Sequence, residues 1–201
     1  MITIVDYGMG NLRSVSKALE HLGGRVKISS KWQEIEKSEK LVLPGVGAFG
    51  DAIRELHYLR LFEPIKRYLE TKRPFLGICL GLQLLFTDSE EDPTAVGLSH
   101  FTGKVIAFRS TQDKIPHMGW NNVSFNKSHP FLKGLNPESY FYFVHSYYAL
   151  PDNPSISLAG CQYGNATFPA ILGQDWQVAT QFHPEKSQKA GLTLLKNFIE
   201  C

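Results

Sequence analysis

The sequence predicts an α/β fold: a single domain over residues 1–201, with a mixed central sheet flanked by helices. Its N-terminal half alternates short apolar runs with segments of helical periodicity, which is typical of parallel βαβ units. From residue 96 onward, closely spaced β-rich segments are separated by turn signals, which indicates antiparallel pairing. The sheet is therefore expected to be parallel in its N-terminal half and more antiparallel in its C-terminal half.

The N-terminal half is predicted to contain four strands that alternate with helices. The strands are expected at 1–5, 26–28, 41–43 and 74–79, and the helices at 12–22, 32–37, 48–58 and 62–71. Gly23 and Gly24 end the first helix, and Pro64 falls in the first turn of the fourth, where proline is tolerated. In parallel sheets, ligands bind beyond the carboxyl ends of the strands, which is where the glycine-rich turns of this chain lie.

The C-terminal half is predicted to contain short strands and a final helix. The strands are expected at 104–108, 122–125, 140–148, 156–163, 168–172 and 176–182, and the helix at 187–200. An acidic run at 88–92 precedes them and is expected to be a solvated loop, because nothing in its pattern fixes the geometry of metal ligands.

Composition and charge exclude several classes of protein. The chain is 43% hydrophobic and 20% charged, which is ordinary for a globular domain. Its net charge of +2 gives no electrostatic argument for nucleic acid or an acidic membrane surface. No stretch approaches the roughly 20 apolar residues of a membrane span. Neither nucleic acid nor a membrane is therefore expected as a partner.

The cysteines point to a reducing compartment. Cys79, Cys161 and Cys201 have no CxxC or metal-ligand spacing, so no metal site is expected. An odd, sparse number of cysteines without an N-terminal signal is typical of the cytoplasm. Cys161 and Cys201 carry no motif and are interpreted as structural or incidental.

A candidate nucleophile lies at a strand-to-helix junction, Gly77-Ile-Cys79-Leu-Gly81-Leu-Gln83, which leads into an apolar continuation at 84–86 suited to a helix. A cysteine at such a junction has the layout of a nucleophile elbow. Gly77 and Gly81 suit a turn that brings backbone segments close together. The helix N-terminus favours the thiolate, and its free amides can stabilise an oxyanion. The alternative is a cysteine buried in an α/β core.

A candidate base and its partner lie far downstream, in Gln181-Phe-His183-Pro-Glu185. Residues two apart in an extended chain point to the same side, so Glu185 can orient His183 and stabilise its imidazolium. Pro184 is expected to end the preceding strand. Alone, this motif also fits a strand-end turn with a solvated glutamate. Together with the elbow cysteine, it favours a Cys-His-Glu triad.

A second glycine-rich turn leaves a different function open. Gly45-x-Gly47-x-x-Gly50 matches the dinucleotide-binding fingerprint, and Glu70 falls twenty residues after the last glycine, at the expected distance for a ribose-binding acid. The turn follows the third strand rather than the first, however, and a second helix intervenes before Glu70. A dinucleotide-binding module therefore stays an alternative. The same glycines suit a loop whose backbone approaches a ligand or changes its peptide orientation.

Several motifs carry a family resemblance. They are G-x-C-x-G-x-Q at 77–83, H-P-E at 183–185, and the segments 6–12, 44–49, 116–121 and 143–148. In this order they resemble the class I, triad-type glutamine amidotransferases. Within that family, the chain is similar to the glutaminase subunits of imidazole glycerol phosphate synthases. Leu82 departs from the pattern, since Met is common there, but the exchange conserves volume.

The resemblance implies hydrolysis of L-glutamine to glutamate and ammonia, without a cofactor, by Cys79, His183 and Glu185. The implied oxyanion site consists of backbone amides at Val46 and Leu80, with Gly45 and Gly47 on either side of Val46. The implied substrate contacts are Gln83, Ser146 and Tyr147. Without the resemblance, Gln83 would be an ordinary helix glutamine, and 141–148 an aromatic core strand. The other six histidines lack a His-x-Glu context and are interpreted as structural or surface residues.

The resemblance also implies a heterodimer with a (β/α)₈ cyclase subunit of histidine biosynthesis, which receives the ammonia. Two glycine-containing segments, 8–11 and 116–121, have no evident catalytic residue and are expected to form this interface. The expected contacts are Asn11, Met118, Trp120 and Asn121. The alternative is that both segments are loops packed on their own core. A paralogous glutaminase that supplies another acceptor, such as a sugar amidination enzyme, would have the same triad.

Overall fold

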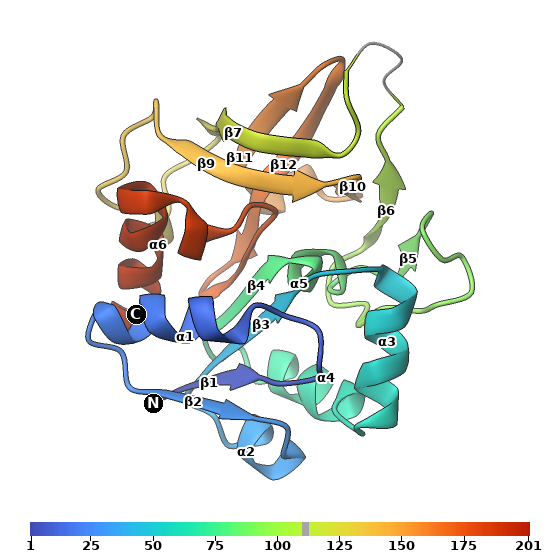
Figure 1. Ribbon diagram of the computed structural model, residues 1–201, viewed down its shortest axis with the longest axis vertical. Coiled ribbons are helices and arrows are strands. Elements are labelled where there is room, and N and C mark those ends of the chain that lie inside the picture. The colour runs from blue at the N-terminus through green and yellow to red at the C-terminus, as the bar shows by residue number, and fades with distance from the viewer. Residues whose placement is uncertain (110–112) are drawn as a thin grey trace.

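An eight-stranded mixed sheet forms the centre of the computed structural model, which describes residues 1–109 and 113–201 (Figure 1). In spatial order, its strands are β2 (Val26–Ser29), β1 (Ile2–Val5), β3 (Lys40–Gly45), β4 (Phe75–Cys79), β13 (Gln177–Thr180), β12 (Ala166–Gln174), β11 (Ser157–Tyr163) and β8 (Ser124–Phe125). The pairs from β2 to β13 are parallel, and the pairs from β13 to β8 are antiparallel. The predicted fold class is therefore confirmed.

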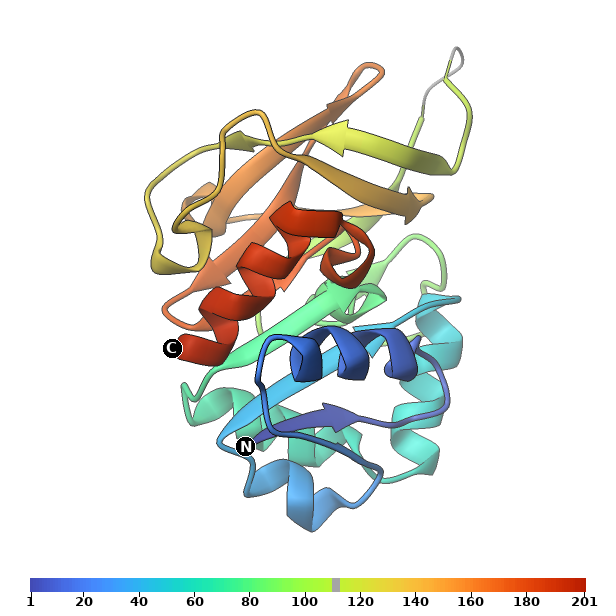
Figure 2. The same ribbon diagram turned by 60° about the vertical axis from the view of Figure 1, so that its left-hand side comes forward.

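Helices cover both faces of the sheet (Figures 1 and 2). They are α1 (Leu12–His21), α2 (Trp32–Glu36), α3 (Phe49–Tyr58), α4 (Phe62–Glu70), the single turn α5 (Leu80–Gln83) and α6 (Gln188–Glu200). Side chains alternate across each strand, so Val42 packs with α1 and α6 on one face, whereas Leu41 and Leu43 pack with α2, α3 and α4 on the other. No helix in the described ranges is long and apolar enough to cross a membrane.

Two smaller sheets lie beyond the central one. One contains β10 (Tyr147–Pro151), β6 (Gly103–Ala107) and β5 (Asp88–Ser89), and the other pairs β7 (His117–Asn122) with β9 (Tyr140–His145). The single strand predicted at 140–148 is wrong, because the chain breaks at Ser146 between two sheets. The Ser146 carbonyl accepts a hydrogen bond from Phe108 N, so it does not continue the β7–β9 ladder. The segment 116–121, for which a loop was the alternative, is mostly strand.

The helix expected through 84–86 ends after one turn, at Gln83. The carbonyl of Leu84 accepts a hydrogen bond from Leu98 N, and the carbonyl of Leu85 accepts from both His100 N and Phe101 N. These carbonyls would otherwise bind the next helical turn. A segment more than ten residues downstream therefore ends the helix.

The acidic run begins with a two-residue strand, Asp88–Ser89, and continues as a turn open to solvent, as expected, but its carboxylates are held by hydrogen bonds. Glu91 accepts a hydrogen bond from Phe49 N, the first residue of α3. Asp92 pairs with Arg54 on the same helix at 3.0 Å, and Glu90 accepts from the backbone of β6 at 2.9 Å. The carboxylates therefore connect residues 88–92 to strand β6 of the three-stranded sheet and to α3.

Candidate active site

Cys79 occupies a strained backbone position between β4 and α5. Its φ of 55° and ψ of −108° lie outside the regions that side-chain-bearing residues favour. A Cβ added to Gly81 would overlap the carbonyl oxygen of Leu43, and one added to Gly77 would lie 2.8 Å from the carbonyl oxygen of Gly81. Both flanking glycines are therefore required sterically, as expected of an elbow. Cys79 lines a cavity of about 300 Å³.

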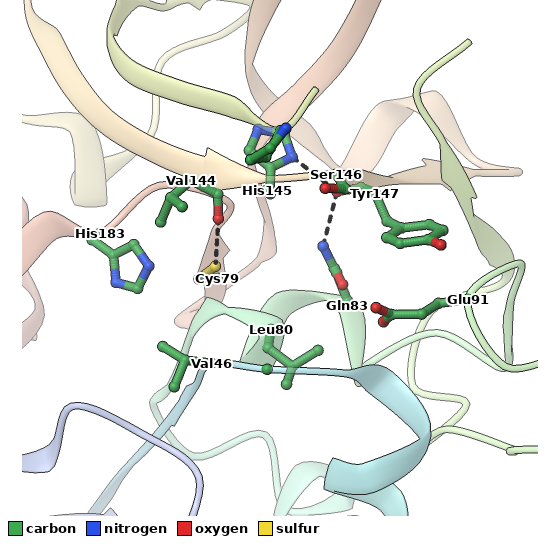
Figure 3. A pocket seen from close by; sticks show the side chains of 12 residues that line it. Val46, Cys79, Leu80, Gln83, Glu91, Val144, His145, Ser146, Tyr147 and His183 are labelled. Atoms are coloured by element: carbon green, nitrogen blue, oxygen red, sulfur yellow. Dashed lines mark hydrogen bonds between the residues drawn. The ribbon is translucent and has the colours of Figure 1, made fainter. Parts of the chain in front are cut away.

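His183 lies beside Cys79 because their strands are neighbours. β13 runs parallel to β4, with Thr180 opposite Ile78, so the two chains leave the sheet at the same edge. Figure 3 shows Cys79 and His183 on the wall of the same cavity. The backbone of His183 is fixed by its N–H, which donates to Tyr142 O, and by its carbonyl, which accepts from Ser187 Oγ at 2.6 Å.

The imidazole of His183 has one occupied and one free nitrogen. Nδ1 is 2.8 Å from Glu185 Oε1, and both side chains are buried. Nε2 is buried without a hydrogen-bond partner. Burial opposes the charged imidazolium, but the hydrogen bond to Glu185 and the negative charges of Cys79 and Glu185 outweigh it and raise the pKa of His183 to about 10. The His183–Glu185 contact is confirmed, although the reason predicted for it is wrong. Residues 184–186 form a 3₁₀ turn rather than an extended chain.

The sulfur of Cys79 contacts Gln181, a residue that was not predicted to belong to the site. Gln181 is fully buried, and its Nε2 donates toward Cys79 Sγ at 3.9 Å. The thiol of Cys79 in turn donates toward Val144 O at 4.0 Å. No local pattern marks Gln181, because β13 ends at Thr180 and the chain bends at Gln181 and Phe182, so the alternation of a strand does not place its side chain.

Gln83 is held by its own neighbours. Its Nε2 donates to Tyr147 O at 2.9 Å and to Gln181 Oε1 at 3.2 Å, which uses both amide hydrogens. Only Oε1 remains for a substrate. The implied contact of Gln83 with the substrate is therefore limited to accepting a hydrogen bond through this oxygen.

The cavity wall contains most of the residues expected for the oxyanion and the substrate. Those are Val46, Gly47, Leu80, Gln83, Ser146 and Tyr147. Gly45 lies just behind the wall, in register with Cys79 at the end of β3. Glu91, Pro116, Val144 and His145 also line the cavity and were not expected there. Among the residues that the structure describes, no group of three or more metal-ligating side chains could hold an ion.

The sequence matches the family described as "Glutamine amidotransferase class-I" over residues 3–201. The chain belongs to this family. A protein named "Imidazole glycerol phosphate synthase subunit HisH" from Syntrophotalea carbinolica is 48% identical over 204 residues, which covers 98% of each chain. One of the same name from Caldanaerobacter subterraneus is 50% identical and covers 100% of this chain and 98% of its own.

Solved structures agree on the fold of this amidotransferase. One described as a glutamine amidotransferase has a TM-score of 0.77 at 19% identity and covers 100% of this chain and 98% of its own. The structure of PurLQS from Thermotoga maritima has a TM-score of 0.75 at 16% identity, and the match covers 99% of this chain and 97% of that one.

The turn at 45–50, which resembled a dinucleotide-binding fingerprint, packs against α5 and lines the Cys79 cavity. The dinucleotide-binding alternative is therefore set aside.

Two histidines of the amidotransferase form a buried hydrogen-bonded chain that the sequence did not reveal. Asn121 Nδ2 lies 3.3 Å from His117 Nε2, and His117 Nδ1 lies 3.0 Å from His145 Nε2. His145 Nδ1 lies 2.8 Å from Tyr147 O. The amide nitrogen only donates and the carbonyl only accepts, which fixes both tautomers. Burial lowers the pKa of His117 to about 4 and that of His145 to about 3, so both rings are neutral near pH 7.

The four residues expected at a partner interface differ in exposure. Met118 is 62% and Trp120 46% exposed on β7. Asn121 also donates to Gln162 O at 2.9 Å, so it is held within the fold. Asn11 is the N-cap of α1 and accepts from Ser14 N. Of these four residues, only Met118 and Trp120 present large exposed apolar surfaces.

Proposed function

We propose that this amidotransferase is the glutaminase subunit of an imidazole glycerol phosphate synthase, acting in histidine biosynthesis. It would hydrolyse L-glutamine to glutamate and pass the ammonia to a (β/α)₈ cyclase subunit. The observation that carries the glutaminase assignment is His183, with Nδ1 on Glu185 and an unpartnered Nε2 beside Cys79. The two relatives named as subunits of imidazole glycerol phosphate synthase match over nearly their full length, which supports the synthase.

In the proposed mechanism, the thiolate of Cys79 attacks the carboxamide carbon of glutamine. His183 carries the proton to the leaving nitrogen, while Glu185 holds its tautomer and stabilises the imidazolium. The collapse of the tetrahedral intermediate releases ammonia and leaves a γ-glutamyl thioester. Water, activated by His183, then releases glutamate and restores the thiol. No step requires a cofactor.

Backbone amides of Val46 and Leu80 would stabilise the oxyanion of both tetrahedral intermediates. Val46 is flanked by glycines, and Gly47 has a φ of 96°. This flexibility supports a turn whose Val46 amide points away from the cavity at rest and into it when the partner binds. Loss of one oxyanion donor typically lowers turnover by about 10²–10³-fold, so such a change would regulate the enzyme strongly.

The charged end of glutamine has matching groups in the cavity. Glu91 is a wall residue whose carboxylate suits the substrate ammonium, and Oε1 of Gln83 is a second acceptor. The backbone of Ser146 and Tyr147 would meet the rest of the amino acid. Glu91 is already held by Phe49 N, which fixes its position before the substrate arrives.

The cyclase is proposed to dock over the exposed side chains of Met118 and Trp120, with Asn11 and Asn121 at the margin. An apolar contact would exclude water from the route of the ammonia, which as ammonium would not be a nucleophile. A reducing cytoplasm suits both the thiolate and the three free cysteines.

The test is glutamate release by the isolated chain, by the complex with the cyclase, and by the complex with an acceptor analogue. We expect a low rate alone and strong stimulation in the third state. Equal rates in all three would refute regulation by the partner. Stimulation only by a different barrel enzyme would favour the paralogous glutaminase. A glutamine-analogue electrophile should label Cys79 and spare Cys161, whose pKa is raised by burial to about 12, and Cys201.

A further inference from the structure

One buried polar atom near the site has no partner and no role in the mechanism. Among the described residues, three buried side-chain nitrogen or oxygen atoms lack a hydrogen bond. Two of them, His183 Nε2 and Glu185 Oε2, belong to the proposed triad. The third is the hydroxyl of Tyr7, a residue with no exposed surface in the loop after β1. An unpaired buried hydroxyl is costly and rare, so it requires an explanation.

The hydroxyl of Tyr7 lies directly behind the proposed oxyanion turn. A Cβ added to Gly45 would be 2.6 Å from it, and 2.8 Å from Leu80 Cβ. Gly45 is therefore enclosed between this hydroxyl and the start of α5. Tyr7 is absent from the cavity wall, whereas Val46 and Gly47 are part of it. The hydroxyl thus lies next to Gly45 without reaching the cavity.

The hydroxyl also remains a proton donor throughout the working range of the enzyme. Burial raises the pKa of Tyr7 well above its usual value, and the negative charge of the nearby Cys79 thiolate raises it further. It makes no hydrogen bond to Cys79 Sγ, so the thiolate does not satisfy it.

The peptide between Gly45 and Val46 is the group that could satisfy this hydroxyl. A peptide plane carries its N–H and its C=O on opposite sides. When the Val46 N–H turns into the cavity, the Gly45 carbonyl turns away from it, and the Tyr7 hydroxyl, beside Gly45 and outside the cavity wall, is a donor within reach of that residue. We propose that Tyr7 is a positioning residue, whose hydroxyl donates a hydrogen bond to the Gly45 carbonyl in the turned-in state. This inference rests on the proposed function.

The consequence is a bias built into the resting enzyme. The hydroxyl is unpaired while the turn is out and paired when the turn is in, so it reduces the energy difference that the partner must overcome. One net hydrogen bond of this kind corresponds to about a 2- to 10-fold change in the population of the turned-in state. In the isolated chain, where the turned-in state is rare, the hydrogen bond changes its population by the full factor. In the activated complex, where that state already predominates, the change in population is smaller.

The test is Tyr7→Phe, which removes only the hydroxyl. We expect kcat of the isolated chain to fall about 2- to 10-fold with KM unchanged, and the loss to shrink toward onefold in the complex with an acceptor analogue. The urea midpoint should stay equal or rise, because an unpaired buried group is removed. The pH profile of Cys79 alkylation by iodoacetamide should not move.

Tyr68→Phe is the matched control. Tyr68 is equally buried, but its hydroxyl donates to Pro74 O at 2.8 Å, with Glu39 O at 3.2 Å as an alternative acceptor, and neither residue lines the cavity. Its removal should lower the urea midpoint and leave kcat unchanged in both states.

Four results would overturn the inference. They are unchanged kcat in Tyr7→Phe, an equal loss in the isolated and activated enzyme, a shifted alkylation profile, or a lowered urea midpoint. The last three would assign the hydroxyl to the thiolate or to the fold. If the parent chain released no glutamate in any state, the proposed function would fail instead.

Discussion

Cys79 and His183 face each other across one sheet edge, but the chain holds them by different means. On the nucleophile side, residues 40–83, Cys79 is fixed by close backbone packing around Gly77 and Gly81. On the base side, residues 140–187, His183 is fixed by hydrogen bonds to its backbone and to Nδ1. The steric fit around Cys79 should allow few substitutions and should not depend on pH. The hydrogen bonds and charges that hold His183 should tolerate changes of side-chain shape but should weaken when the pH changes the protonation of the groups involved.

The largest effect should come from substituting the catalytic residues themselves, because Cys79 from one side and His183 from the other act as one unit. Cys79→Ala is expected to lower kcat for glutamine hydrolysis by about 10⁴–10⁶-fold, and His183→Ala by nearly as much. The double variant should lose no more than either single one, because the two residues act on the same step. Glu185→Gln should cost less, since the base remains. Glutamate release in quenched assays measures all four. Losses that multiply would mean that the residues act independently.

The next effect tests steric fit on the nucleophile side. Gly81→Ala should destabilise the fold by at least about 3 kcal/mol, the upper end of overpacking costs, because its Cβ would overlap Leu43 O. Gly160→Ala, on β11, is the matched control, since the nearest atom to its Cβ would be 3.7 Å away. That change should be near neutral. Urea unfolding compares the two, and similar losses at both positions would refute the steric argument.

The pH dependence of stability should come from the base side. The pKa of His183 is raised to about 10 from an unfolded value of about 6.5, so its contribution is complete below pH 6.5 and lost as the pH rises through 10. The pKa values of His117 and His145 are lowered to about 4 and about 3, so stability falls as the pH drops below 6.5. Each group contributes at most about 1.4 kcal/mol per pH unit.

Substitutions can separate the alkaline limb of the stability profile, where stability falls as the pH rises, from the acid limb, where it falls as the pH drops. His183→Gln should flatten the alkaline limb of the urea midpoint between pH 6.5 and 10. His117→Gln should flatten the acid limb between pH 6.5 and 4.5, before the surface carboxylates titrate. An unchanged alkaline limb in His183→Gln would show that the imidazolium is not stabilised in the folded state.

The smallest effect concerns the backbone of Cys79. A side chain at its φ and ψ costs about 1–3 kcal/mol, which glycine would not incur. Cys79→Gly should therefore be more stable than Cys79→Ala by about 1 kcal/mol, after the greater chain entropy of glycine is included. Thermal or urea unfolding of the two inactive variants decides it. An alanine variant as stable as the glycine one would mean that the elbow is not strained.

The same difference explains what the sequence could and could not predict. The elbow, the N-terminal strands and the His-x-Glu pair have local signatures: glycine spacing, apolar runs and a short motif. Gln181, Glu91 and the His117–His145 pair owe their positions to hydrogen bonds between residues far apart, which leave no local pattern. The break at Ser146 has the same origin, in a single hydrogen bond from Phe108. Steric requirements appear in the sequence, whereas distant polar contacts appear only in the fold.

The position of β4 in the sheet also matters while the chain is being made. Its two neighbours are β3, which precedes it, and β13, which follows about 100 residues later. At the usual 5–20 residues per second, a ribosome would need roughly 5–20 s to deliver β13. During that interval β4 has an unpaired apolar edge, the kind of surface that recruits other strands. The nascent chain thus carries its cysteine for seconds before its histidine exists, so premature release would yield an aggregation-prone fragment without glutaminase activity.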